Sequence, residues 1–99
     1  MRIKAELKFY EKRILQNKTD QLAIAEIKIW KIPKSTHYPQ GLKYSLFLVS
    51  SGTVLVGFDN HKPKGPHLHL GNKEVFYDFS TPARLLQDFW ELTKKAGYE

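Results

Sequence analysis

Residues 43–58 read KYSLFLVSSGTVLVGF, and this stretch sets the expectation for the fold. Apolar and β-branched residues run from Lys43 to Val49 and from Thr53 to Phe58, on either side of Ser51-Gly52. Two such runs joined by a two-residue turn with glycine are typical of a β-hairpin. The turn predicts three cross-strand pairs: Val49 with Val54, Phe47 with Val56, and Ser45 with Phe58.

This pairing divides the predicted hairpin into two apolar faces. One face would pack on a helix near the C-terminus, and it consists of Phe47, Val49, Val54, Val56 and Phe58. The other face carries Tyr44, Leu46, Leu48 and Leu55. One helix cannot cover both faces, so we expect the N-terminal segment or a second copy of the chain to cover the second face. Between these two, we favour the second copy, which predicts a homodimer.

Two more runs precede the hairpin. Residues 22–32 alternate as a strand, which ends at Pro33 because proline lacks the N–H that a ladder needs. Residues 3–15 fit either a strand or a helical stripe, and we favour a strand because residues 17–20 have turn composition. Pairing across that turn would set Glu11 near Glu26, which is unfavourable for like charges and leaves the register open.

The C-terminal third predicts short strands at 67–70 and 75–77, followed by a helix over 82–96. Thr81 suits the N-cap, Pro82 the first helical position and Gly97 the residue after the helix. The apolar stripe of the helix contains Leu85, Leu86, Phe89, Trp90 and Leu92, and we expect Trp90 to lie in the core. The predicted fold is α+β: an antiparallel sheet of four to five strands with one C-terminal helix packed on one face, in a single domain of residues 1–99.

Composition limits the classes of function. The chain has 99 residues, no cysteine and a net charge of +6, with 16 Lys and Arg against 10 Asp and Glu. The lack of cysteine excludes disulfides, thiolate chemistry and zinc–sulfur sites. No apolar run is long enough for a membrane span, and residues 1–6 do not form a secretory signal, so we expect a cytoplasmic protein. The positive charge fits nucleic-acid binding or simply a solvated basic surface.

Reactive side chains are concentrated in residues 59–72, DNHKPKGPHLHLGN. His67 and His69 are two residues apart, so in an extended chain both point to one side. That geometry suits metal binding, with Asp59 or His61 as the third ligand. It also suits acid–base catalysis without a cofactor, in which Lys64 would stabilise phosphate charge.

The histidines of this stretch also have a purely structural explanation. A solvated polar loop with incidental histidines would account for His67 and His69, but the neighbouring Asp59 and Lys64 favour a site. His37, in a separate polar loop, is interpreted as incidental. Pro63 and Pro66 stiffen the loop, which favours a preorganised site.

The pattern resembles the TumE family of toxins from toxin–antitoxin systems. The resemblance rests on Phe58-Asp59-Asn60, on Lys64-Gly65-x-His67-x-His69, and on Leu85-Leu86-x-Asp88-Phe89-Trp90 in the helix. The segments Ile29-Trp30-Lys31-Ile32-Pro33 and Lys43-Tyr44 are similar to the family too. One departure is Pro66, which stands where the family has an acid, so any role of that acid is in doubt here. The resemblance implies a small intracellular toxin neutralised by a cognate antitoxin.

We therefore interpret the chain as a toxin that acts on RNA as a metal-independent ribonuclease. His67 and His69 would be base and acid in either order, Lys64 the cation, and Asp59 the group that orients an imidazole. Two alternatives stay open: a non-enzymatic basic module that binds nucleic acid or protein, and a metal-dependent hydrolase that uses the two histidines with Asp59 or His61.

Overall fold

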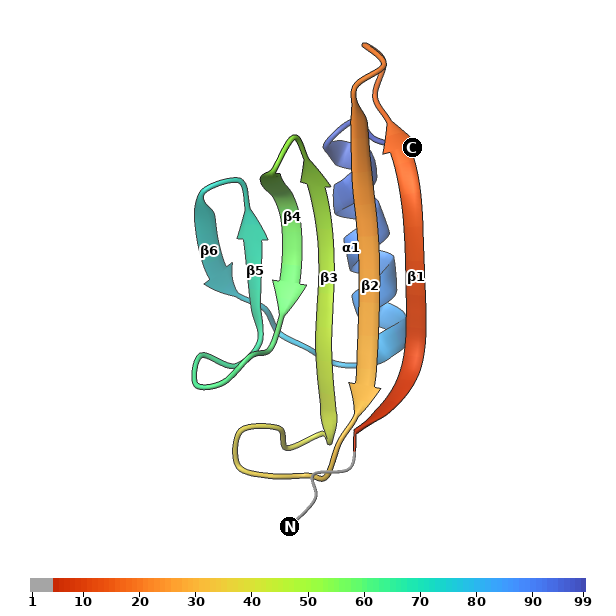
Figure 1. The fold of residues 1–99 in the computed structure, drawn as a ribbon. Coiled ribbons are helices and arrows are strands. Elements are labelled where there is room, and N and C mark those ends of the chain that lie inside the picture. The colour runs from red at the N-terminus through yellow and green to blue at the C-terminus, as the bar shows by residue number, and fades with distance from the viewer. Residues whose placement is uncertain (1–4) are drawn as a thin grey trace.

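The computed structural model describes residues 5–99, which form an antiparallel sheet and a helix (Figure 1). The elements are β1 (Glu6–Gln16), β2 (Leu22–Lys31), β3 (Leu42–Ser50), β4 (Thr53–Asp59), β5 (His67–Leu70), β6 (Lys73–Phe76) and α1 (Pro82–Lys95). The strands lie in the sheet in chain order, and each is antiparallel to its neighbours. Ile3, in the predicted N-terminal run, lies outside the described residues.

The α+β class with a C-terminal helix is confirmed, but the expected number of strands is wrong. The described residues form a six-stranded sheet, not one of four to five strands. The difference arises because both short runs after residue 66 pair as strands, β5 with β4 and β6 with β5. The predicted limits of the last strand, 75–77, are wrong, because β6 starts directly after the Gly71-Asn72 turn and ends at Phe76. Within residues 5–99, no helix is long and apolar enough to cross a membrane.

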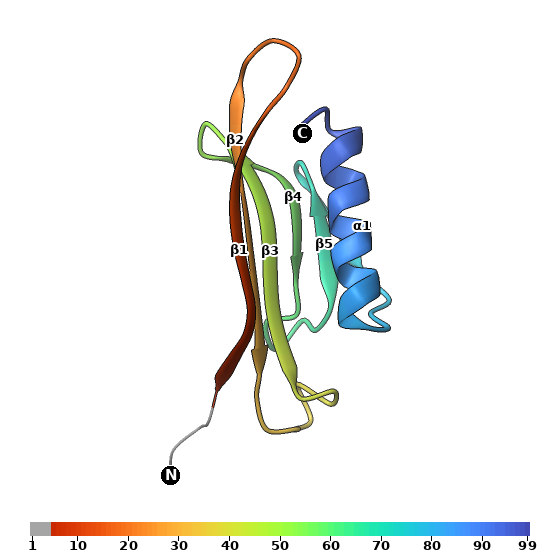
Figure 2. The same ribbon diagram turned by 90° about the vertical axis from the view of Figure 1, so that its right-hand side faces the viewer.

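Helix α1 covers one face of the sheet and leaves the other without a helix (Figure 2). We call these the helix face and the open face. On β2 the expected alternation is confirmed, because Ala23, Ala25, Ile27 and Ile29 are buried on the helix face. The core is completed by Leu15, Tyr44, Leu46, Leu48, Val56, Phe58, Leu85, Phe89 and Tyr98.

A bulge shifts the register of the β3–β4 hairpin. Val49 pairs with Val54 as predicted, but Leu48 then pairs with Val56 and Leu46 with Phe58. The predicted pairs of Phe47 with Val56 and of Ser45 with Phe58 are therefore wrong. The extra residue on β4 is Leu55, and a one-residue shift moves every partner side chain beyond it to the other face.

The face expected to need a separate cover is therefore the core of the molecule. Leu46 and Leu48 are fully buried together with Phe89, whereas Phe47 and Val49 lie on the open face. The predicted packing of Phe47, Val49 and Val54 on the helix is wrong, although Val56 and Phe58 do lie on the helix face. The apolar patch that motivated a homodimer is thus not a free surface.

The N-terminal run forms strand β1, which confirms the strand predicted from the turn composition of residues 17–20. In the observed register Lys12 pairs with Glu26, and Glu11 pairs with Ile27. The expected repulsion between Glu11 and Glu26 is avoided by this one-residue offset. On the open face, the hydroxyl of Tyr10 donates to the Glu26 carboxylate at 2.8 Å.

The helix begins and ends close to the predicted limits. The Thr81 side chain accepts a hydrogen bond from the Arg84 N–H, and Pro82 is the first helical residue. Gly97, after the helix, has a φ of +97°, which favours glycine. Trp90 is half-buried at the edge of the core, with the Arg13 guanidinium 4.5 Å from its ring centroid.

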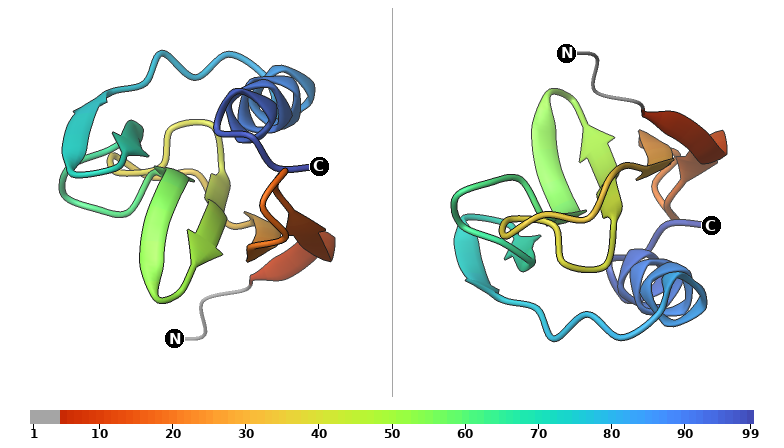
Figure 3. Two further views of the ribbon diagram at one scale, coloured as in Figure 1. Left: turned by 90° about the horizontal axis from the view of Figure 1, so that it is seen from above. Right: turned by 90° about the horizontal axis from the view of Figure 1, so that it is seen from below.

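The segment between β6 and α1 crosses the helix face and closes the core (Figure 3). Tyr77 packs edge-on against Phe58, with ring centroids 4.8 Å apart, and Phe79 stacks on Tyr44 at 5.3 Å. The Tyr77 hydroxyl donates to the Asp88 carboxylate at 2.6 Å and so ties the segment to the helix. The helix face is therefore filled at its centre, and Asp59, His67, His69 and Glu74 lie on the open face.

Candidate functional site

The open face carries a cluster of ionisable side chains where β4, β5 and β6 lie side by side (Figure 1). The sheet register pairs Asp59 with His67, and it places His69 between Gly57 and Glu74. Paired residues of adjacent strands point to the same face, so these side chains meet there. The loop between β4 and β5 adds Lys64.

Asp59 lies between the two histidines. Its Oδ1 is 3.4 Å from Nε2 of His67, and its Oδ2 is 3.2 Å from Nε2 of His69. Oδ1 also accepts a hydrogen bond from the His61 backbone N–H at 3.2 Å. The Asp59 side chain is only 17% exposed, so its contacts with the two imidazoles are largely shielded from solvent.

The tautomer of His67 follows from its contacts. Nδ1 lies 2.6 Å from the carbonyl oxygen of Gly65, which can only accept, so Nδ1 carries a hydrogen. Gly65 has a φ of +76°, a conformation that turns this carbonyl toward the ring. Nε2 is therefore the nitrogen available for proton transfer or metal binding, and it lies 3.4 Å from Asp59 and 3.5 Å from Glu74.

Lys64 and Glu74 form an ion pair at the edge of the cluster. The Lys64 ammonium donates to Oε1 of Glu74 at 2.8 Å. This hydrogen bond lowers the pKa of Glu74 and raises the pKa of Lys64. The other carboxylate oxygen, Oε2, lies 3.7 Å from Nδ1 of His69. Glu74 thus connects the cation to the imidazoles.

Asn60 supports the cluster without joining it. Its buried amide accepts a hydrogen bond from the Tyr44 N–H at 2.9 Å and donates to the Leu42 carbonyl at 2.8 Å. These bonds continue the pairing of β4 with β3 beyond the last strand residue. Asp59 is consequently held in place from the helix side while its carboxylate points to the open face.

All four predicted site residues, Asp59, Lys64, His67 and His69, line one shallow hollow of about 310 Å³ on the open face. His61 lines the same hollow, but its side chain is exposed and its contact to the cluster is through the backbone. His37 is exposed in the loop before β3 and does not line this hollow.

Glu74 was missed by the sequence reasoning. The signal that would have found it is Gly71-Asn72, a two-residue turn that sets Leu70 opposite Lys73 and therefore His69 opposite Glu74. Pro66 stands where the resemblance led us to expect an acid in the loop. The cluster does contain a second carboxylate, but Glu74 supplies it from β6.

The arrangement has the donor set of a metal site. One ligand atom from each of Asp59, His67 and His69 lies within 4.8 Å of the others. The donation from His67 Nδ1 to a backbone carbonyl is the kind of outer contact that orients metal-binding imidazoles. The same geometry also allows proton transfer, because each Nε2 is directed at a carboxylate and borders the hollow.

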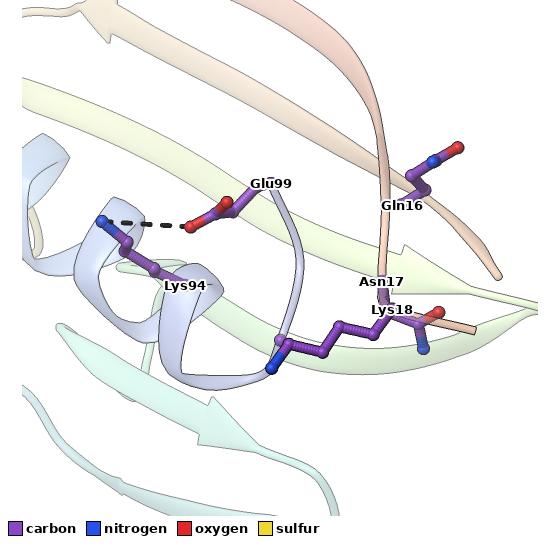
Figure 4. A pocket seen from close by; sticks show the side chains of 6 residues that line it. Gln16, Asn17, Lys18, Lys94 and Glu99 are labelled. Atoms are coloured by element: carbon purple, nitrogen blue, oxygen red, sulfur yellow. Dashed lines mark ion pairs between the residues drawn. The ribbon is translucent and has the colours of Figure 1, made fainter. Parts of the chain in front are cut away.

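A larger hollow lies elsewhere, between the β1–β2 turn and the C-terminal residues (Figure 4). It is lined by Gln16, Asn17, Lys18, Lys94, Gly97 and Glu99. The chain end is held there by two backbone hydrogen bonds between Gln16 and Glu99, both 3.2 Å. Lys94 and Glu99 form an exposed ion pair at 3.9 Å, and no histidine lines this hollow.

Comparison with known proteins places the chain. The family model described as Toxin TumE matches residues 1–96. The chain belongs to the TumE toxin family. This membership makes it a toxin component of a toxin–antitoxin system and implies an antitoxin partner. No curated protein and no solved structure matches the chain significantly.

Proposed function

We propose that this TumE-family chain acts on RNA in the cytoplasm and cleaves its phosphodiester bonds at the Asp59–His67–His69 cluster. The observation that carries the proposal is the pair of imidazoles held by one half-buried carboxylate, with both Nε2 atoms within 3.4 Å of Asp59. Two imidazoles beside a lysine are the groups that cleavage of RNA without a cofactor requires.

In this mechanism the base takes the proton of the ribose 2′-hydroxyl, and the 2′-oxygen forms a bond to phosphorus. The bond from phosphorus to the 5′-oxygen breaks, and the acid supplies the proton that the leaving oxygen needs. We assign the acid to His67, whose side chain is 10% exposed and whose Nε2 lies 3.4 Å from Asp59 and 3.5 Å from Glu74. His69, whose side chain is 25% exposed, is the base.

Lys64 stabilises the charge on the phosphate oxygens in this scheme. Its ammonium is paired with Glu74, so the substrate phosphate must compete with that carboxylate for it. Asp59 orients the imidazoles and stabilises the imidazolium that forms on His69. Glu74 keeps Lys64 beside the hollow before RNA binds.

The test is cleavage of a labelled RNA by the purified chain, together with growth arrest of cells that express it. His67→Ala and His69→Ala should each lower cleavage by about 100-fold or more and relieve the growth arrest. His37→Ala is the matched control, and circular dichroism establishes that each variant is folded. Cleavage and toxicity that survive both site substitutions would exclude this cluster. RNA binding without any cleavage would support the alternative of a non-enzymatic binding module.

A metal-dependent hydrolase is the second candidate, favoured by the distances in the cluster. The Nε2 to Oδ distances of 3.2 and 3.4 Å are close to the edge of a tetrahedron of ligands around zinc, about 3.4 Å for bonds of about 2.1 Å. A bound ion would activate a water molecule in place of the imidazole base.

Chelation separates the two candidates. The metal-independent mechanism predicts that activity survives EDTA followed by dialysis. Activity that is lost on chelation and restored by a divalent cation would instead support the hydrolase. In that case Asp59→Asn should lower the metal content of the purified protein, measured by elemental analysis.

A further inference from the structure

We propose that the open face binds single-stranded RNA, and that the bases on either side of the cleaved phosphate stack on Phe47 and Phe76. This inference rests on the proposed ribonuclease function, and it adds the class of RNA and the residues that position it. The two phenylalanines lie on opposite sides of the histidine pair on the same face of the sheet.

Sheet register places Phe76 next to the acid. Phe76 pairs with His67 across β5 and β6, so both side chains point to the open face. The Phe76 side chain is 72% exposed, which is unusual for a phenylalanine in a strand. It borders a hollow of about 280 Å³ that is also lined by Lys64 and His67.

Phe47 lies on the other side of the cluster, on β3. It pairs with Gly57, which in turn pairs with His69. The ring centroids of Phe47 and His69 are 6.0 Å apart, and the ring planes are inclined by 33°. An aromatic ring at this position can hold a base directly beside the proposed general base.

Gly57 makes Phe47 a preformed platform. A Cβ atom at Gly57 would lie 2.6 Å from Cδ1 of Phe47 and closer still to Cε1. The ring therefore rests on the backbone of β4, in space that is available only because this residue is glycine. Phe47 is half-buried, so part of its ring remains available from the open face.

The chemistry around these rings favours a nucleic acid over an apolar partner. The row of paired residues that contains His67 and Phe76 continues through Asp59 and Ser45 to Lys28. An apolar protein surface packed here would remove the ionisable groups of this row from water, which costs free energy. A single-stranded nucleic acid instead offers bases for the rings and phosphates for Lys64 and Lys28.

Single-stranded RNA is specified because stacking requires bases that are not already paired. In a duplex both faces of each base are covered by its neighbours, and the strands cannot open without cost. The two hollows that share Lys64 and His67 are shallow, so they can accept a flexible strand across the sheet. The bases would then lie on both sides of the phosphate held at the histidines.

The experiment measures affinity separately from cleavage. The probe is a short fluorescent oligonucleotide with 2′-O-methyl groups, which lacks the attacking hydroxyl, and binding is followed by fluorescence anisotropy. Phe76→Ala and Phe47→Leu should each weaken binding by about 5- to 100-fold, the range found for loss of one base-stacking contact. Phe9→Ala is the matched control, because Phe9 is a partly exposed phenylalanine on the helix face.

The outcomes distinguish this proposal from the proposed function. A duplex of the same sequence should bind more weakly than the single strand, and His37→Ala, outside both hollows, should keep the affinity for the probe. Equal affinity of Phe76→Ala, Phe47→Leu and Phe9→Ala, or equal affinity for duplex and single strand, would overturn the stacking proposal while leaving cleavage by the histidines intact. Loss of probe binding in the phenylalanine variants of a chain that cleaves no RNA would instead overturn the ribonuclease function alone.

Discussion

Asp59 and Asn60 are neighbours in the chain with different tasks. Asp59 contacts both imidazoles on the open face, whereas Asn60 binds the backbone of β3 on the way into the loop. The sequence motif Asp-Asn therefore combines a site residue with a residue that positions it. Such a division cannot be read from the residue types alone, because either side chain could serve as a ligand or as a backbone partner.

The ion pair of Lys64 and Glu74 leads to a prediction about titration. The Lys64 hydrogen bond is the main cause of the lowered pKa of Glu74, and His67 and His69 contribute in the same direction. Lys64→Gln should therefore raise the pKa of Glu74 toward its usual range, as measured by NMR of the Glu74 carboxyl carbon. Lys62→Gln, which removes a nearby lysine from the same loop, should leave that pKa in place.

The sign of the corresponding stability effect follows from the lowered pKa. Ionised Glu74 contributes fully to stability at pH values above the ordinary pKa of a glutamate side chain. This contribution is lost as the pH falls through the lowered pKa of Glu74 in the folded state. The Lys64→Gln variant should therefore lose less stability than the wild type on acidification. An unchanged Glu74 pKa in that variant would show that the pair is not formed in solution.

At the level of the strands, Gly57 and Phe47 form a coupled pair across β3 and β4. Gly57→Ala should destabilise the protein by about 1–3 kcal/mol, because the new methyl group overlaps the Phe47 ring. In a Phe47→Ala background the same change should cost little, because the ring is absent. Urea unfolding of the two single variants and the double variant measures this coupling. Additive effects would mean that the ring does not rest on Gly57.

Strand and helix prediction succeeded where the pattern was local. The alternation of β2 and the capping residues of α1 each specify their element within a few residues. The predicted faces of the hairpin were wrong because of Leu55, since a bulge adds one residue without a characteristic sequence and moves the later residues of β4 to the other face relative to β3. Four site residues were found because residues 59–69 bring them together in sequence, whereas Glu74 depends on the β5–β6 pairing.

At the level of the whole molecule, the open face separates into two regions. The β4–β6 end carries the ionisable cluster, and the β1–β2 end exposes apolar residues, among them Ile14, Leu22 and Ile24. The centre of the helix face is covered by α1 and by the segment that precedes it. Catalysis and a protein contact through the exposed apolar residues of β1 and β2 would therefore use the same side of the molecule.

The order of the strands has a consequence for how quickly the chain folds. Each strand pairs with the strand that precedes it in the chain, so every pairing in the sheet closes a short loop. Helix α1, in contrast, packs against strands that lie far from it in the sequence. Gly52→Ala, which strains the tight β3–β4 turn at a φ of +75°, should mainly slow refolding. Phe89→Ala, at the docked helix, should mainly speed unfolding. Stopped-flow kinetics in urea that show the reverse assignment would place helix docking before the hairpin.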